Sequence, residues 1–382
     1  MGNHDLGSGE GCKMKKTFLL LLSLLCLPAF TGEFPIGIYA LDPIGEGTYR
    51  AAANSGFNYV FYYVDILTAK ERVSRLLDTS EKCGMKVALQ VVRGKHILRD
   101  PEHLKKLRTA VREWKNHPAL GMWYLFDEPS PELHERLLNI YKMLKTETPD
   151  IPVLLCLSWI KNYQVFKDCA DILMPDLYPV KNQKFPDAPL NQFSHFVWDV
   201  KRLKKPVMPI AQIMSFVNYP KMVKVDPKSC REPNAQELRY FSFSVMTMDV
   251  CGIAYYSFWD IWRQYRFKSY FLKEAKPVFL EVREFAMAVD GMKFECHSKK
   301  IGTGYPPKFF CSSWQKDGRS QIVFVNNTSK PVEGEFQLER TLPSGSLSPW
   351  GQTRSVKATN LGSRLVLERV APWEVLIWSC GK

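Results

Sequence analysis

Short apolar segments rich in β-branched and aromatic residues alternate with amphipathic segments from residue 34 to residue 260. The amphipathic segments carry apolar residues at helical spacing and end at helix-stop signals such as Gly84. Alternation of this kind is typical of parallel strands joined by helical crossovers. The eight predicted strands are FPIGIYAL (34–41), FNYVFYYV (57–64), MKVALQVV (85–92), ALGMWYLF (119–126), IPVLLCLS (151–158), ADILMPDLYP (170–179), PVMPIAQIMSF (206–216) and GIAYYSFWD (252–260).

The number of these repeats predicts a closed barrel. Eight strand and helix units within about 260 residues match a (β/α)8 TIM barrel, whereas an open doubly wound sheet usually has fewer strands. An open sheet of that kind would also carry a Gly-rich phosphate-binding turn, and the sequence contains neither GxGxxG nor a P-loop pattern. We therefore predict the α/β class, with a (β/α)8 barrel over residues 33–292.

The pattern changes after residue 292. Residues 293–382 form short segments with a period of two, separated by Gly, Pro, Ser and Asn turns, which predicts a small C-terminal antiparallel β-sandwich. We expect this domain to pack against the barrel and to support it rather than to bind a ligand. Asn326 and Asn327 begin two N-glycosylation sequons, which matter only if the source glycosylates its secreted proteins.

The N-terminal region carries a targeting signal. Lys13, Lys15 and Lys16 precede the apolar run 17–30, which is typical of a signal peptide and too short to cross a membrane comfortably. We therefore exclude residues 1–32 from the fold and expect a secreted or periplasmic protein with no membrane span in the mature chain.

Export makes disulfides chemically possible. Eight of the ten cysteines follow the predicted signal peptide. Cys296 and Cys311 flank a short turn-rich stretch, so we predict them as the best candidate pair, while the other cysteines fit buried free thiols equally well.

The composition excludes a disordered or fibrous chain, because 46% of the 382 residues are hydrophobic and only 24% are charged. The formal net charge of +13 favours an acidic glycan over nucleic acid as a partner, since the sequence has no arginine-rich run and no aromatic-basic ribonucleoprotein pattern. It also shows no Cys and His spacing of a metal site. We expect no cofactor and no metal.

The strongest chemical motif lies at the end of the fourth predicted strand. In a barrel of this kind the active site is built where the carboxyl ends of the strands meet. The apolar sequence WYLF runs directly into Asp127 and Glu128 and stops at Pro129. Apolar surroundings favour the protonated form of a carboxyl group, which a general acid needs near neutral pH. A purely structural alternative is that both residues cap the next helix.

The strand ending in Asp-Glu-Pro resembles the acid/base strand of clan A glycoside hydrolases, in which Asn-Glu-Pro or Asp-Glu-Pro carries the proton donor. The aromatic eighth strand YYSFWD (255–260) and the β domain with APWEVLIW (371–378) are also similar to those enzymes. The resemblance implies that Glu128 is the catalytic acid/base. It also implies that Asp127 contacts the sugar hydroxyl next to the anomeric carbon.

The seventh strand departs from that family pattern. Retaining enzymes of clan A place a nucleophilic Glu there, whereas this chain has Gln212, which cannot form a glycosyl ester. Three explanations remain open: another mouth carboxylate takes the role, an acetamido group of the substrate replaces it, or the barrel binds glycans without cleaving them. For the first explanation we take Asp176 as the second catalytic residue, with Asp260 next.

Aromatic and polar residues after the strands are candidates for substrate binding. A pyranose face can stack on an aromatic ring, and Trp159, Tyr178 and Trp259 follow strand ends, although each alone fits core packing better. Gln212 is predicted to bind substrate or to position water. Arg93 could bind a substrate carboxylate or sulfate, or could hold a neighbouring carboxylate in its ionised form.

Together these features predict a secreted glycoside hydrolase-like protein that cleaves O-glycosidic bonds of a poly- or oligosaccharide. The alternative is a non-catalytic carbohydrate-binding barrel, because of Gln212 on the seventh strand.

Overall fold

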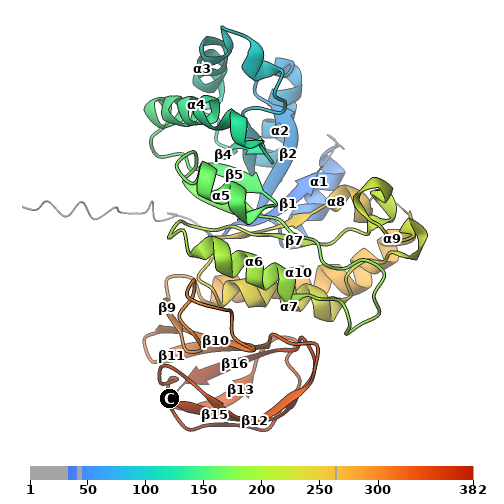
Figure 1. The fold of residues 1–382 in the computed structure, drawn as a ribbon, viewed down its shortest axis with the longest axis vertical. Helices are drawn as coiled ribbons and strands as arrows, with labels where there is room; N and C mark the ends of the chain where they lie inside the picture. The colour runs from blue at the N-terminus through green and yellow to red at the C-terminus, as the bar shows by residue number, and fades with distance from the viewer. Residues whose placement is uncertain (1–32, 41–44, 263–264, 382) are drawn as a thin grey trace, which may run out of the picture.

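The computed structural model describes residues 33–40, 45–262 and 265–381, and the predicted signal segment 1–32 lies outside them. Figure 1 shows a barrel with its helices in blue to yellow and, below it, a β domain in orange and red that carries the C-terminus. No helix in the described part of the chain has the length and apolar character needed to cross a membrane.

All eight predicted barrel strands are confirmed. They pair in parallel in the order β6-β5-β4-β3-β2-β1-β8-β7, and isolated bridges from Leu173 to Val207 and from Asp176 to Ile210 join the two edges. The predicted TIM barrel is therefore present. Its strands are β1 (Ile36–Ala40), β2 (Tyr59–Asp65), β3 (Lys86–Gln90), β4 (Leu120–Asp127), β5 (Val153–Leu157), β6 (Ile172–Pro175), β7 (Ile210–Gln212) and β8 (Ile253–Tyr256).

Helices connect the strands and cover the outside of the barrel (Figure 1). The longest connection before a helix, between β7 and α7, ends in a capping box in which Asn234 and Glu237 bond each other's backbone N–H groups. The helices are α1 (Glu46–Ala53), α2 (Lys70–Lys82), α3 (His103–Trp114), α4 (His134–Glu147), α5 (Ile160–Phe166), α6 (Asn191–Lys201), α7 (Ala235–Met246), α8 (Phe258–Trp262), α9 (Tyr265–Tyr270) and α10 (Lys276–Ala288).

Successive side chains of each barrel strand point alternately into the barrel and out toward the helices, which divides the core into two layers. On β4, Met122 and Tyr124 belong to the cluster inside the barrel, whereas Trp123 and Leu125 pack outward against the helices. All four side chains are fully buried. Because side chains fill the barrel interior, a ligand can reach only the ends of the strands.

The predicted C-terminal β-sandwich is also confirmed. A five-stranded antiparallel sheet in the order β13-β16-β11-β10-β9 faces a three-stranded sheet in the order β12-β15-β14, and Phe324, Leu365 and Trp378 lie in the core between them. The strands are β9 (Lys293–Cys296), β10 (Phe309–Lys316), β11 (Arg319–Asn326), β12 (Val332–Gln337), β13 (Ser346–Pro349), β14 (Ala358–Asn360), β15 (Arg364–Val370) and β16 (Val375–Gly381).

The predicted pairing of Cys296 with Cys311 is wrong, because both thiols are free. Strand register gives the physical reason. Cys296 on β9 stands opposite Ser312 on β10, and neighbouring residues of a strand point to opposite faces. Cys311 therefore points into the sandwich core, away from the face that Cys296 shares with Ser312.

Candidate active site

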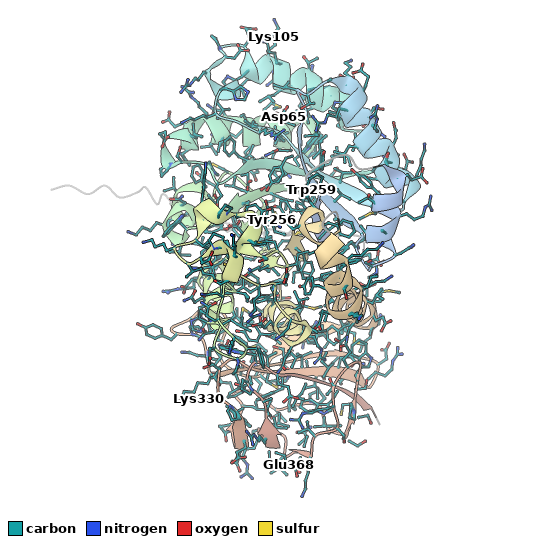
Figure 2. The ribbon with its side chains drawn as sticks, turned by 90° about the vertical axis from the view of Figure 1, so that its right-hand side faces the viewer. Asp65, Lys105, Tyr256, Trp259, Lys330 and Glu368 are labelled. Atoms are coloured by element: carbon teal, nitrogen blue, oxygen red, sulfur yellow. The ribbon has the colours of Figure 1, made fainter. Side chains whose placement is uncertain are left out.

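A cavity of about 120 Å³ lies at the carboxyl ends of the barrel strands. The residue Tyr256, which closes β8, belongs to its wall, and Figure 2 shows this residue on the barrel, far from Glu368 at the distal end of the sandwich. Four of the lining residues are tyrosines and three are carboxylic acids. The wall consists of Tyr39, Tyr63, Asp127, Glu128, Cys156, Asp176, Tyr178, Ile210, Met214, Met222 and Tyr256.

The end of β4 presents two carboxylates to this cavity. The pairing of β4 with β5 shifts register between Tyr124 and Asp127, so that Asp127 stands opposite Cys156. The Tyr124 hydroxyl donates to Asp127 Oδ1 over 2.6 Å, which holds this carboxylate in place. Register and hydrogen bond together bring Asp127 to the inner side of the barrel mouth.

Glu128 follows in the left-handed backbone region, with φ at +50°. This conformation costs a residue with a side chain roughly 1–2 kcal/mol, and such outliers are concentrated at functional sites. The Glu128 N–H donates to the Cys156 carbonyl over 3.1 Å, and the side chain is exposed at the rim of the cavity. The local strain therefore positions a solvent-accessible carboxylate above the cavity.

Asp176 contributes the third carboxylate, directly after β6. Its Oδ2 accepts a hydrogen bond of 3.3 Å from the Tyr178 hydroxyl. Its Oδ1 is buried and accepts no hydrogen bond from any residue that the structure describes. Burial, and then the charges of Glu128 and Asp127, raise the pKa of Asp176 well above its usual range. Asp176 therefore tends to hold a proton when the other two carboxylates are ionised.

Tyrosine rings form most of the polar wall around these acids. The rings of Tyr178 and Tyr256 stack with centroids 5.7 Å apart, and Tyr39 packs edge-on against Tyr256 at 5.5 Å. Burial raises the pKa of Tyr256 to about 12, so its hydroxyl stays protonated and can donate. A wall of ring faces with hydroxyl groups between them suits a ligand that has both apolar faces and polar edges.

Gln212 does not face the cavity. Its side chain is 1% exposed, accepts from the Val180 N–H over 2.9 Å, and donates to the carbonyls of Val180 and Met214. The side-chain oxygen and nitrogen of Gln212 are therefore both hydrogen-bonded to backbone groups. Gln212 therefore fastens the segment after β6 to the end of β7, rather than binding substrate as we expected.

Asp260 is likewise buried, at 2% exposure, and lies outside the cavity wall. Its carboxylate accepts from Ser257 over 2.5 Å, from Asn218 over 2.8 Å and from Tyr219 over 2.8 Å. Burial raises the pKa of Asp260. Because Asn218 and Tyr219 lie between β7 and α7, these bonds make Asp260 an anchor for that segment.

The other predicted binding residues lie around the rim or away from it. Trp159, just before α5, is 72% exposed, and Arg93, shortly after β3, is also exposed. Trp259 on α8 is partly buried. None of these three lines the cavity, whereas Tyr178 does, together with the three carboxylates Asp127, Glu128 and Asp176.

Seven of the eleven cavity residues were not predicted as site residues: Tyr39, Tyr63, Cys156, Ile210, Met214, Met222 and Tyr256. Cys156 and Tyr256 lie at inward positions of β5 and β8, and counting inward positions along those strands could have found them. Met222 lies on the segment between β7 and α7, and no sequence pattern predicts where such a connection lies.

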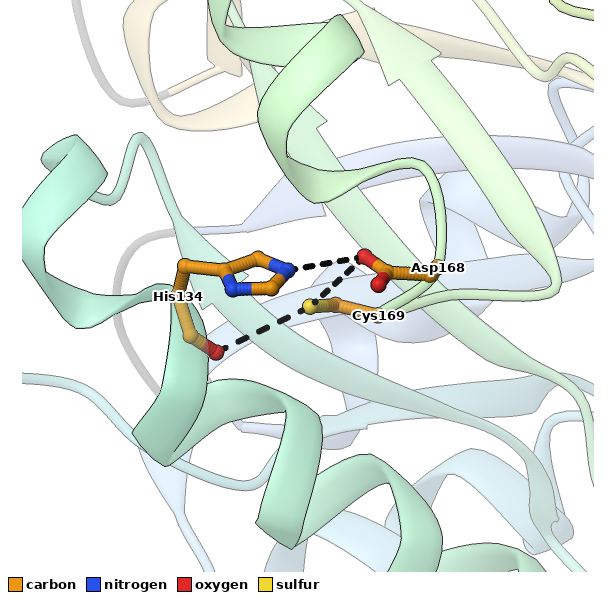
Figure 3. Close-up of side chains that lie close together, drawn as sticks. All are labelled: His134, Asp168 and Cys169. Carbon is orange, nitrogen blue, oxygen red and sulfur yellow. Dashed lines mark hydrogen bonds and ion pairs between the residues drawn. The ribbon is translucent and has the colours of Figure 1, made fainter.

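The cavity is not a compact metal centre. Among the described residues, two groups of His, Cys, Asp or Glu have ligand atoms that all lie within 4.8 Å of one another, and neither group belongs to the cavity. One of them, made of His134, Asp168 and Cys169, is shown in Figure 3. The arrangement at the mouth is instead a cluster of three carboxyl groups surrounded by hydroxyls.

Comparison with solved structures places the chain in a known fold class. It is similar to an alpha-amylase from Geobacillus thermoleovorans, with a TM-score of 0.54 and 12% identity over 92% of this chain and 98% of that one. It is similar to a glycoside hydrolase family 30 subfamily 8 xylanase from Clostridium acetobutylicum, with a TM-score of 0.52 and 11% identity over 91% and 96%. It is also similar to a family 30 endoxylanase from Clostridium papyrosolvens, with a TM-score of 0.51 and 12% identity over 92% of this chain and 97% of that one.

The chain thus has the fold of glycoside hydrolases in which a barrel is followed by a β domain, and the predicted resemblance is confirmed at the level of the fold. By sequence, the chain matches no protein-family model and no curated protein.

Proposed function

We propose that this protein hydrolyses O-glycosidic bonds of a poly- or oligosaccharide, with Glu128 and Asp176 as its catalytic carboxyl groups. One observation carries this proposal: Asp127, Glu128 and Asp176 reach a single cavity at the mouth of a barrel whose structural neighbours are an amylase and xylanases. The same fold hosts many chemistries, so the carboxyl groups and not the barrel are the basis of the proposal.

Glycoside hydrolysis needs one protonated and one ionised carboxyl group on the two sides of the scissile bond. In the proposed reaction, Glu128 protonates the glycosidic oxygen as the C–O bond breaks, and a water molecule supplies the hydroxyl that ends on the sugar. Asp176 acts as the second carboxyl group. Its raised pKa favours a proton on Asp176 in the free protein, and in the proposed reaction this proton passes to Glu128 before the bond breaks, which leaves Asp176 ionised. Asp127, held by Tyr124, contacts a sugar hydroxyl.

Substrate recognition is proposed to extend beyond the cavity to the rim. The exposed ring of Trp159 follows β5, next to the β4 end that carries Glu128, and offers a stacking platform for a further sugar. Arg93 after β3 is proposed to bind an acidic substituent, which its exposure supports. The Lys-rich start and apolar run of residues 1–32 support export to a compartment where polysaccharides are met.

The proposal is tested by the release of reducing sugar from a broad panel of natural glycans. Residues 33–382 are compared with Glu128→Gln, Asp176→Asn and the control Glu132→Gln, which changes an exposed carboxylate on the same connection after β4. We expect the first two variants to lose about 10²-fold or more of the activity and the control to keep it.

A substrate with a nitrophenol leaving group separates the two roles, because such a group departs without protonation. If Glu128 is the proton donor, Glu128→Gln retains far more activity on a nitrophenyl glycoside than on the natural glycan, whereas Asp176→Asn does not. The reverse pattern would exchange the two roles. Glycan binding by all variants without turnover by any would replace the proposal with the carbohydrate-binding alternative.

A further inference from the structure

A second cluster of chemically active side chains lies on the outside of the barrel, away from the cavity. His134 is the first residue of α4, and Asp168 and Cys169 lie between α5 and β6 (Figure 3). His134 Nε2 lies 2.9 Å from Asp168 Oδ1, and Cys169 Sγ lies 3.6 Å from the same oxygen. An imidazole nitrogen, a carboxylate oxygen and a thiol sulfur therefore converge, although Asp168 and Cys169 follow His134 by 34 and 35 residues in the chain.

The distances between these atoms fit the coordination sphere of zinc. Zinc binds His nitrogen and carboxylate oxygen at about 2.0 Å and thiolate sulfur at about 2.3 Å. With those bond lengths, the present separation of His134 Nε2 and Asp168 Oδ1 corresponds to a ligand angle of about 90°. The separation of Cys169 Sγ and Asp168 Oδ1 corresponds to about 110°. Both angles suit a distorted tetrahedron, and the third pair, a His134 ring nitrogen and Cys169 Sγ, lies within 4.8 Å.

Burial divides the cluster into a closed side and an open side. Cys169 is fully buried, the His134 side chain is 28% exposed, and that of Asp168 is 51% exposed. The ring of Phe166 packs beside the imidazole, with centroids 5.9 Å apart. A cation would therefore be held from the protein side by sulfur, nitrogen and oxygen, and its fourth position would face water.

The charges around the cluster are mixed. Burial, and then Asp168, raise the pKa of the Cys169 thiol to about 12, while Lys205 and Lys142 act in the opposite direction. The Lys205 ammonium group donates a hydrogen bond to the Ala170 carbonyl over 2.6 Å. Binding of a soft divalent cation would displace the thiol proton, as metal ligation does for a coordinating thiol.

We propose that His134, Asp168 and Cys169 form a binding site for one zinc ion, with water as the fourth ligand. The mixture of imidazole, thiolate and carboxylate favours zinc over magnesium or calcium, which prefer oxygen ligands alone. The site connects the start of α4 to the segment that leads into β6. Zinc is thus a crosslink on the outer wall of the barrel and takes no part in bond cleavage at the mouth.

Cobalt(II) is the probe for this site, because a bond between cobalt and a thiolate gives a charge-transfer band that oxygen and nitrogen ligands do not give. We expect the purified protein to develop this band with one equivalent of cobalt(II) and to lose it when zinc is added. Cys169→Ser should abolish the band, and His134→Ala should weaken binding at least tenfold.

The second cluster, Asp78, Glu81 and His117, supplies the matched control, because it pairs His117 with Asp78 at 3.2 Å but contains no thiol. The band and the affinity should be unchanged in His117→Ala. A band that survives in Cys169→Ser, or no band in the native protein, would overturn the proposal. Near-ultraviolet circular dichroism of metal-free Cys169→Ser checks that this variant is folded. Asp168→Asn changes a side chain that is 51% exposed, and it should also lower the affinity for cobalt(II).

Discussion

At the scale of single residues, the three carboxyl groups of the cavity differ in their surroundings. Asp127 receives a hydrogen bond from Tyr124, Glu128 is exposed on a left-handed turn, and Asp176 has a buried oxygen. Burial, and then the charges of Glu128 and Asp127, raise the pKa of Asp176. Environments that separate the protonation of neighbouring acids are typical of acid and base pairs in active sites.

Replacement of Asp176 by Asn should make the protein more stable near neutral pH while abolishing activity. The pKa of Asp176 is raised in the folded state above the unfolded value of 3.8, so the folded state binds more protons between the two values. The contribution of Asp176 to stability is then present below pH 3.8 and is lost as the pH rises through the folded pKa. We expect Asp176→Asn to gain about 1 kcal/mol or more at pH 7.

Urea unfolding of native protein and Asp176→Asn at pH 3.5 and pH 7 measures this difference. The advantage of the variant should shrink toward zero at the lower pH. A variant that is less stable than the native protein at pH 7 would show that the Asp176 carboxylate is stabilised by its neighbours.

Gln212→Ala should lower stability by about 2–4 kcal/mol. The substitution removes three buried hydrogen bonds and leaves the backbone groups of Val180 and Met214 unpaired. The midpoint of thermal unfolding and the kinetic constants are measured together. A raised KM with an unchanged midpoint would restore Gln212 to the role of a substrate ligand.

The sequence predicted the site only in part at this scale. The Asp127 and Glu128 pair was detectable because an uninterrupted apolar strand runs into it, and strand ends in a barrel converge at one mouth. The role of Gln212 was not detectable, because its partners Val180 and Met214 are identified only by the three-dimensional course of two connections.

At the scale of elements, the connection between β7 and α7 forms one side of the cavity. It contains three short 3₁₀ turns, and its Met222 lines the cavity although 61% of that side chain is exposed. Asp260 holds this connection through Asn218 and Tyr219, and the Tyr219 hydroxyl, whose proton goes to Asp260, lies 3.2 Å from the Tyr256 hydroxyl in the cavity wall and can accept from it. A chain of hydrogen bonds thus links a buried anchor to the site.

Asp260→Asn should loosen this connection without removing a reacting group. The asparagine side chain has only one oxygen that can accept a hydrogen bond. With that oxygen in the place of Oδ1, its NH2 group faces the hydroxyl donors of Ser257 and Tyr219 and cannot accept from them. We expect about a tenfold loss of kcat/KM and faster proteolysis within residues 213–234, while the unchanged barrel retains measurable turnover. A loss comparable to that of Glu128→Gln, with unchanged proteolysis, would instead make Asp260 a catalytic residue.

The regular elements were more predictable than the connections between them. Every barrel strand coincides with an apolar segment that is bounded by polar or turn residues, as the apolar run that ends at Asp127 illustrates. The apolar residues of the connection after β7 do not recur at a helical or strand spacing. Met214, Phe216 and Cys230 instead pack together in a small cluster of their own. Local periodicity cannot predict the path of a segment that is stabilised by such contacts.

At the scale of the whole molecule, the sandwich is joined to the barrel through polar contacts as well as apolar ones. The Asn327 side chain accepts hydrogen bonds from Ser194 on α6 and Tyr240 on α7, and it donates to the Pro307 carbonyl over 2.8 Å. Asn326 and Asn327 are 0% and 2% exposed. The two sequons therefore serve packing in the folded protein, and their amides are not accessible to a glycan-transferring enzyme.

The ion pair of Arg239 on α7 and Glu281 on α10 lies at the same junction. Arg239 bonds both carboxylate oxygens of Glu281, over 2.7 Å and 2.8 Å, and donates to the Val375 carbonyl of the sandwich over 2.9 Å. The two residues are only 9% and 3% exposed. Breaking a buried pair by removal of one partner costs about 3–5 kcal/mol, because the other charge is left unpaired.

Arg239→Met should therefore destabilise the protein by about that amount, whereas the double variant Arg239→Met with Glu281→Met should recover part of the loss. Recovery stays incomplete because Glu281 also accepts from the Gln352 N–H over 2.8 Å. Urea unfolding of the native protein, both single variants and the double variant gives the coupling energy. If the sandwich depends on this junction, tryptophan fluorescence and far-ultraviolet circular dichroism coincide in one transition in the native protein and separate in Arg239→Met. Coincident, unshifted transitions in Arg239→Met would mean that the apolar contacts alone hold the two domains together.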